Sequence, residues 1–179
     1  MAKTLEELLH QGRSLLNLSE WVAMNDQGIA TKLGIHQDNF LRLFENKWNF
    51  ENGVLEDYGN QHLLYAKTKL SCWFQKSERK LKRYNLYLIN EFISYPYTLN
   101  LLFSSLHAQE VTYHSRVSKN FVQQLAAMLA KCLEEPSPRT DNLNNGLNHS
   151  IQSLRDFSEK LIPMGREELA DKYLEIKNS

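Results

Sequence analysis

The sequence predicts an all-α fold, and three observations indicate it. Proline and glycine interrupt helices, and the chain of 179 residues holds only 4 Pro and 7 Gly. Leucine, lysine, glutamate and glutamine, which favour helices, are plentiful. Apolar residues recur at spacings of three and four, which is the period of one helix face. With 42% hydrophobic residues the chain can bury a sizeable core, as one domain or as a small head on a larger body.

The first predicted helix begins at Thr4. Thr4 and Glu7 have the spacing of a capping box, in which each side chain binds the backbone N–H of the other residue. Apolar positions then follow one helix face, and we expect this helix to support the segment that comes after it. The face consists of Leu5, Leu8, Leu9, Gly12, Leu15 and Leu16.

Two short helices with a glycine between them are predicted in residues 25–47. Asn25 or Asp26 can cap the first of them. Gly34 can adopt the left-handed conformation that ends a helix, and Ile35 can then fill the corner between two crossing helices. The spacing predicts a helix-turn-helix, although an ordinary αα-corner without a partner has the same spacing. The apolar faces of the two helices consist of Ile29, Ala30 and Leu33, and of Phe40, Leu43 and Phe44.

The same periodicity predicts further helices in the rest of the chain. A long helix runs from Trp48 to about Leu70, with Asn46 or Asn49 as its cap, and should connect a head to a body. Residues 141–149, which are rich in asparagine and contain a glycine, are predicted to form a loop. The remaining helices are expected over residues 84–94, 98–106, 115–133, 150–161 and 165–176.

Composition and motifs argue against several classes of protein. No apolar run approaches the ~20 residues of a membrane span, and no secretory signal is present, so we expect a soluble, cytoplasmic protein without a membrane partner. Cys72 and Cys132 lie far apart without nearby histidines, and the six histidines are scattered singly, so no metal is expected. Without a phosphate-binding glycine loop or a Gly-x-Ser-x-Gly motif, we expect no cofactor and no catalytic residues.

Two groupings have both a functional and a structural interpretation. His107, Glu110 and His114 can share one helical face, as an enzyme site would require, but a solvent-facing or hydrogen-bonded trio is the favoured interpretation. Residues 67–83 hold seven basic residues against Glu78, a net charge of +6. This run is either a patch for nucleic acid or an anionic membrane, or a solvated helix end, and the second interpretation is favoured.

The helix-turn-helix residues resemble the N-terminal signature of the TetR family of one-component repressors. Trp21 stands where that family has an aromatic residue before its second helix, and Leu15-Leu16 stand where its first helix ends in a Leu-Phe pair. The resemblance covers about residues 4–55, and the AraC family shares the core of the pattern. The matching positions are Ile29-Ala30, Gly34-Ile35, Phe40, Phe44 and Lys47.

The resemblance implies a helix-turn-helix DNA-binding domain at residues 1–47 and a helical ligand-binding and dimerisation domain at residues 48–179. It implies a transcriptional regulator, expected to be a repressor, that binds a double-stranded DNA operator as a homodimer. The helices at 115–133 and 150–176 should form the dimer, because their apolar faces offer more surface than one thin body can cover. The DNA-binding residues expected by this resemblance are Asn25, His36, Gln37, Asn39, Arg42 and Lys47, the last as a phosphate contact.

The resemblance also implies a small hydrophobic or aromatic effector in the body. Large aromatic residues gather in the middle of the chain, and packing in a helical core accounts for most of them. The candidate ligand-binding residues are Tyr65, Trp73, Tyr87, Phe92, Phe103 and His107.

Three positions depart from the family pattern. His36 replaces a capping Ser or Thr, Asp38 replaces a small residue, and Leu41 replaces a tyrosine that reaches the phosphates. Residues 1–50 carry five cations and six anions, a net charge of −1, which also disfavours DNA because a duplex is held largely through its phosphates. The alternative is therefore a helical sensor or protein-interaction module that keeps this fold but has lost operator binding.

Overall fold

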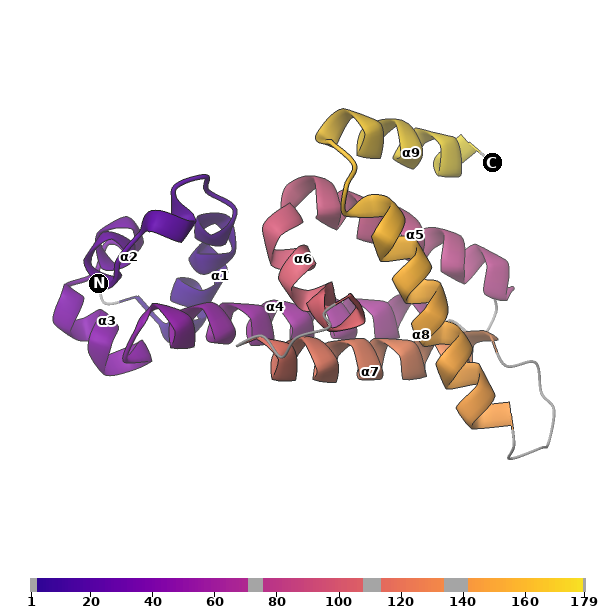
Figure 1. The fold of residues 1–179 in the computed structure, drawn as a ribbon, viewed down its shortest axis with the longest axis horizontal. Coiled ribbons are helices and arrows are strands. Elements are labelled where there is room, and N and C mark those ends of the chain that lie inside the picture. Colours follow the sequence, from indigo (N-terminus) through magenta and orange to yellow (C-terminus); the bar gives the residue numbers. More distant parts are fainter. Residues whose placement is uncertain (1–2, 71–75, 108–113, 134–141, 179) are drawn as a thin grey trace. The chain divides into compact units, whose positions relative to one another are not determined.

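The computed structural model describes residues 3–70, 76–107, 114–133 and 142–178, and every element within these ranges is a helix (Figure 1). The predicted all-α class is confirmed. The chain divides into two compact units, residues 1–60 and residues 61–179, here called the head unit and the body unit. The division falls within the long helix α4 (Lys47–Leu70). None of the described helices is both long enough and apolar enough to cross a membrane.

The head unit begins with the predicted capping box. Thr4 Oγ1 accepts from the N–H of Glu7 at 3.2 Å, and Glu7 Oε2 accepts from the N–H of Thr4 at 2.7 Å. Gly12 in this first helix lets it approach α4 closely, since a Cβ there would lie 2.3 Å from Cγ2 of Val54. The elements of the head unit before α4 are α1 (Leu5–Leu16), the 3-10 helix η1 (Trp21–Ala23), α2 (Asp26–Leu33) and α3 (Gln37–Phe44).

The turn between α2 and α3 has the predicted geometry. Asn25 caps α2, its side-chain oxygen accepting from the N–H of Gly28 at 2.8 Å. Gly34 ends the helix in the left-handed region, with φ 69°, where a side chain would be strained. The N–H of Ile35 then donates to the carbonyl of Ala30 at 3.0 Å, a bond typical of glycine-terminated helices. The helix-turn-helix is confirmed as a structure, with Ile35 half-buried at its corner.

An aromatic cluster fills the core of the head unit. The ring centroids of Phe40 and Phe44 lie 5.5 and 4.9 Å from that of Phe50, and the Trp21 ring lies 6.1 Å from Phe50. Leu43 was expected on the same apolar face but is 47% exposed. In a helix of eight residues, Phe40 and Phe44 lie one turn apart and face the core together, while Leu43 is rotated away from them.

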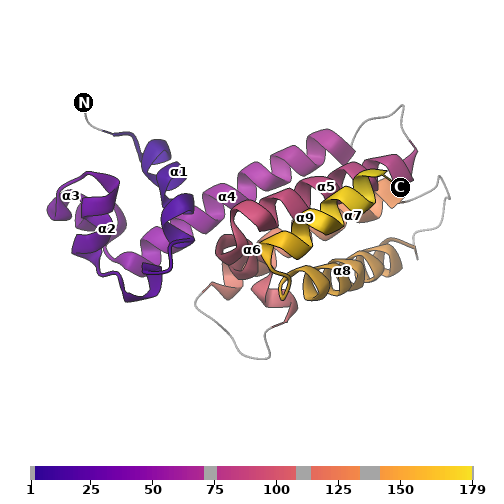
Figure 2. The ribbon, with the colours of Figure 1, turned by 90° about the horizontal axis from the view of Figure 1, so that it is seen from above.

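The body unit contains the end of α4 and the remaining helices. Figure 2 shows α9 lying along α5 and α8 beside α7, the two most extensive helix pairs among the described residues. Pro96 occupies the first position of α6, where its missing N–H and fixed φ are tolerated. These helices are α5 (Ser77–Ser94), α6 (Pro96–Phe103), the 3-10 helix η2 (Ser104–Leu106), α7 (Ser115–Leu133), α8 (Asn142–Leu161) and α9 (Arg166–Asn178).

One predicted feature of the body unit was wrong. Helix α8 begins at Asn142, so most of the predicted loop at 141–149 is helical. Asparagine and glycine have low helix propensity, but packing of α8 against α7 overrides it. The apolar residues expected to offer a dimer surface on α7 and α8 are covered only in part. Phe121, Leu125, Leu154 and Leu161 are buried within one protomer, whereas Val117, Met128 and Ile151 are half-buried.

Candidate nucleic-acid interface and ligand cavities

Helix α3 presents the expected recognition residues to solvent. Asn39 and Arg42 are exposed, one turn apart, and Arg42 Nη2 donates to Asn39 Oδ1 at 3.2 Å. Gln37 lies at the first position of the helix and is half-buried. This exposed face offers amide and guanidinium groups, which are the side chains that read base edges in a major groove.

The start of α3 is weakly capped. His36 Nδ1 lies 3.4 Å from the backbone nitrogen of Asp38 and 3.4 Å from Oδ2 of the same residue. A neutral Nδ1 can accept from the N–H, whereas a protonated Nδ1 can only donate to the carboxylate, so one nitrogen cannot serve both contacts at once. Both side chains are highly exposed, at 74% and 87%. Asp38 therefore places a carboxylate on the surface that would face a phosphate backbone.

Lys47 is engaged within the head unit. Its Nζ lies 2.7 Å from the carbonyl oxygen of Trp21 and 3.0 Å from those of Val22 and Met24, which occupies all three ammonium donors. The ammonium also lies 4.6 Å from the Trp21 ring centroid. The backbone N–H of Lys47 donates to Asp26 Oδ1 at 2.8 Å. This geometry argues against the expected phosphate contact and favours a role in joining α4 to η1 and α2.

The other cations of the head unit are also engaged. Lys3 donates to the carbonyl of Leu33, Arg13 pairs with Asp57 at 2.7 Å, and Lys32 pairs with Glu20 at 3.2 Å. Among the described cations of residues 3–50, Arg42 alone has neither a carboxylate nor a backbone carbonyl as its hydrogen-bond partner. The outward positive charge of the head unit is therefore small.

The turn between α3 and α4 is strained. Glu45 has φ 65° and ψ −41°, and it is the only non-glycine residue with positive φ in the described chain. The N–H of Asn46 donates to the carbonyl of Phe44 at 2.7 Å, closing a γ-turn around Glu45. Asn46 Oδ1 accepts from the N–H of Asn49 at 2.9 Å and so caps α4, as predicted. The contacts of Lys47 and Asn46 hold this turn in place.

The expected ligand-binding residues do not gather in one cavity. Phe92 and Phe103 are buried, with ring centroids 6.0 Å apart, and they fill the core of the body unit. Tyr65 and Tyr87 stack at 3.8 Å and line a cleft on α4 and α5. Trp73 lies outside the described residues.

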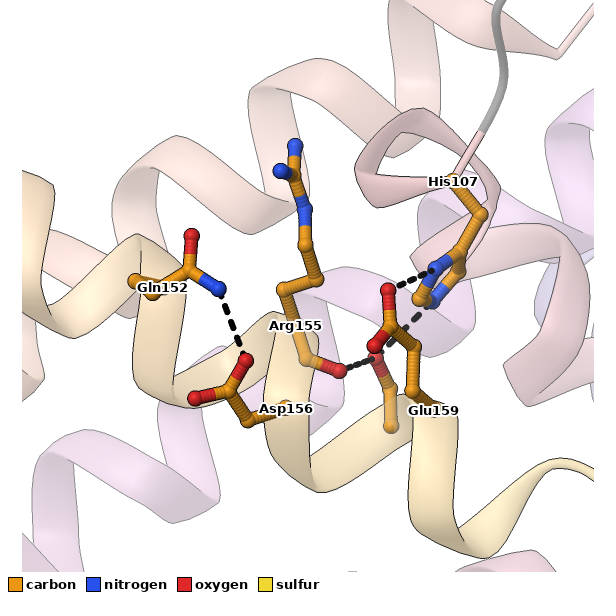
Figure 3. Close-up of polar contacts among 6 residues, drawn as sticks. His107, Gln152, Arg155, Asp156 and Glu159 are labelled. Carbon is orange, nitrogen blue, oxygen red and sulfur yellow. Dashed lines mark hydrogen bonds and ion pairs between the residues drawn. The ribbon is translucent and has the colours of Figure 1, made fainter.

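His107 contacts α8 rather than an open cavity (Figure 3). Its Nε2 lies 2.9 Å from Ser158 Oγ, and its Nδ1 lies 3.6 Å from Glu159 Oε1. The connectivity resembles a Ser-His-acid triad, but Ser158 is only 1% exposed and its hydroxyl donates to the carbonyl of Arg155. A buried hydroxyl used in this way cannot attack a substrate, so the group has a structural role.

The predicted trio of His107, Glu110 and His114 is not a described site. Glu110 lies outside the described residues, and His114 is buried. Within the described ranges, no group of three or more His, Cys, Asp and Glu side chains could hold a metal ion.

An apolar pocket lies between α5, α7 and α8, here called the α5–α8 pocket, with a volume of about 340 Å³. Its leucines and Phe157 would contact an apolar ligand, and Asn85 and Ser153 offer hydrogen-bonding groups. Sequence reasoning missed these residues because apolar residues that line a pocket follow the same spacing as those that fill a core. The lining consists of Leu81, Tyr84, Asn85, Leu88, Leu129, His149, Ser150, Ser153, Leu154 and Phe157.

Comparison with known proteins bears on the fold. No family model and no curated protein sequence matches the chain. A crystal structure of a protein assigned to the TetR family of transcriptional regulators, from a Rhodococcus species, is similar in structure, with a TM-score of 0.54 and 13% sequence identity. The match covers 96% of this chain and 94% of the other. The chain therefore has the fold of a TetR-family regulator, a helical helix-turn-helix head with a helical body.

Proposed function

We propose that the protein is a transcriptional regulator that binds a DNA operator through α3 as a homodimer. The observation that carries this proposal is the exposed face of α3, the second helix of the helix-turn-helix, which presents Asn39 and Arg42 to solvent. The likeness in fold supports it, since the similar structure is assigned to a family of transcriptional regulators. In this proposal residues 1–47 contact DNA, and residues 48–179 bind the effector and form the dimer.

The effector in this proposal is a small hydrophobic molecule that occupies the α5–α8 pocket. About 340 Å³ is enough for a compact ligand, and the leucines of α5, α7 and α8 supply an apolar lining. A ligand that binds more tightly to one of two conformations of the body shifts the population towards that conformation, and this is how it would change operator affinity.

Selection of sequences from a random duplex library, followed by fluorescence anisotropy across salt concentrations, tests operator binding. We expect enrichment of a pseudo-palindromic sequence and a shallow dependence of affinity on salt, because few side chains of the head unit are free to replace counterions. Light scattering in the same buffer should give twice the protomer mass of 21.0 kDa. A library that stays unenriched at low salt would exclude operator binding.

A second candidate function is a protein-interaction module that has lost operator binding. The observation that favours it is the surface near α3, where Leu43 is 47% and Trp48 is 51% exposed while Asp38 and Glu45 supply carboxylates. Exposed apolar side chains with acidic neighbours suit a protein partner better than a phosphate backbone. Two results together would support this function. The duplex library would stay unenriched, and one specific protein would bind to the wild type but not to the double variant Leu43→Ala/Trp48→Ala.

A further inference from the structure

A second cavity, chemically different from the α5–α8 pocket, lies on α4, α5 and α9 of the body unit. Its volume is about 410 Å³. We call it the tyrosine cleft, because three of the side chains that line it are tyrosines. The lining consists of Tyr65, Lys69, Arg83, Leu86, Tyr87, Asn90 and Tyr173.

The aromatic side of the tyrosine cleft is formed by stacked rings. Tyr65 and Tyr87 lie with ring centroids 3.8 Å apart and planes 28° apart, so the two rings brace each other. Tyr65 remains 36% exposed, so part of its side chain is accessible to a ligand. A flat apolar ring that entered the cleft would find aromatic surface already in a fixed orientation.

The charged side of the tyrosine cleft is positive. Among the described residues that line it, Lys69 and Arg83 are the only charged ones, and none carries a carboxylate. Lys69 Nζ lies 5.2 Å from the centroid of the Tyr65 ring, so a cation and an aromatic surface are adjacent. Both cations belong to the basic run of residues 67–83, whose net charge is +6. The potential of this run adds to their attraction for an anion.

We propose that the tyrosine cleft binds a small anionic aromatic molecule, such as an arene carboxylate. Its carboxylate would contact the ammonium of Lys69 and the guanidinium of Arg83, and its ring would pack against Tyr65 and Tyr87. Among the described residues that line the α5–α8 pocket there is no lysine or arginine to pair with such a ligand. This site goes beyond the proposed function, whose effector is hydrophobic and occupies the other cavity.

Titration calorimetry of the full-length protein with benzoate, 1-naphthoate and indole-3-acetate tests the proposal, with the neutral amide of each as its control. We expect at least one carboxylate to bind and its amide to bind at least tenfold more weakly. Lys69→Met and Arg83→Met should each weaken carboxylate binding about tenfold, since each removes one of two cations in the cleft. Lys119→Met removes an exposed cation of α7 outside the cleft and should change nothing.

Two further variants locate the ligand. Tyr65→Phe keeps the ring and should bind within twofold of wild type, whereas Tyr65→Ala should bind several-fold more weakly. Ser153→Phe fills the α5–α8 pocket and should leave carboxylate binding unchanged. Thermal unfolding of each variant shows whether it is folded. If Lys69→Met or Arg83→Met does not fold, the comparison of Tyr65→Phe with Tyr65→Ala still tests the site.

Several results would overturn the proposal. Equal affinity for an acid and its amide, or no binding of any of the three carboxylates, would do so. Loss of binding only in Ser153→Phe would place the ligand in the other pocket. Competition by a random duplex at equal phosphate concentration would show that the basic run binds polyanions in general. Because these titrations contain no operator, they are independent of the test of DNA binding. A protein that enriches an operator but binds no arene carboxylate would keep the proposed function and lose the tyrosine cleft as a site.

Discussion

The Nε2 atom of His62 lies 2.8 Å from the hydroxyl oxygen of Tyr84 inside the body unit, and each residue is only 1% exposed. The two rings meet edge to face, with centroids 5.8 Å apart. Burial lowers the pKa of His62 to about 3 and raises the pKa of Tyr84 well above its usual range. Both groups are therefore neutral in the folded protein at neutral pH.

This pair predicts a loss of stability in acid. Between pH 6.5 and about 3, His62 is protonated in the unfolded chain but not in the folded one, so the unfolded state binds more protons. The free energy of unfolding should then fall as pH decreases below about 6.5, at a rate of up to ~1.4 kcal/mol per pH unit from this residue. Urea unfolding at several pH values from 7.5 to 4.5 measures this dependence of the free energy of unfolding on pH.

The control for this prediction is a pair of glutamine variants. His62→Gln should show a smaller loss of stability in acid than wild type, while His149→Gln, at an exposed position, should follow wild type. Parallel loss of stability in wild type and His62→Gln would show that another group is responsible.

Lys47→Met should destabilise the head unit. The change removes three hydrogen bonds to backbone carbonyls and the contact with the Trp21 ring, at a cost on the order of 1–3 kcal/mol. The rate of hydrogen exchange of the α2 and α3 amides measures this local loss of stability. Lys32→Met, which breaks only an exposed pair with Glu20, is the matched control and should change exchange little. Equal exchange in all three proteins would exclude the structural role of Lys47.

Glu45→Gly should stabilise the head unit relative to Glu45→Ala. Both changes remove the side chain that accepts from Asn49 Nδ2 at 3.2 Å, but only glycine adopts φ 65° without a Cβ penalty. We expect a difference of about 1 kcal/mol in the free energy of unfolding, measured by urea denaturation. If alanine proves as stable as glycine, the γ-turn at Glu45 is not strained.

Arg42→Ala should weaken operator binding by on the order of 1–3 kcal/mol and relax the preference at particular base pairs. The reason is that Arg42 is the exposed cation of α3 and lies beside the amide of Asn39. Anisotropy titrations with the selected operator and with single-base variants measure both effects. Lys32→Met, whose cation is already paired, should bind as wild type does. Unchanged base preference in Arg42→Ala would remove α3 as the reading helix.

The elements of the head unit could be predicted from sequence because their signals are local. Thr4, Asn25 and Gly34 each act on backbone groups within a few residues, and each has the predicted conformation or hydrogen bond. The role of Lys47 could not be predicted in this way. Its carbonyl partners lie 23 to 26 residues earlier in the chain, and their approach depends on how η1 folds against α4.

The sites were predictable only in part, for a similar reason. Asn39 and Arg42 were expected from the resemblance to the TetR family, and both lie on an exposed face of α3. The α5–α8 pocket needed the structure, since Leu81, Leu129 and Phe157 come from three helices and nothing in their spacing distinguishes them from core residues. The basic run at 67–83 was interpreted as a solvated helix end, and the position of Arg83 and Tyr87 of α5 beside Tyr65 and Lys69 of α4 became visible only once the two helices were seen together.

The internal pairing of the head-unit cations bears on how such a protein would search a chromosome. DNA-binding domains with a net positive charge bind any stretch of duplex and then slide along it. This speeds their arrival at the operator, but it also leaves many of the protein molecules bound to non-specific DNA. A head whose lysines bind its own carbonyls and carboxylates gains little from this long-range capture. It would reach its operator mainly by three-dimensional diffusion and would dissociate quickly from non-specific DNA. Occupancy of a promoter would then follow the number of protein copies in the cell and change little with the ionic conditions.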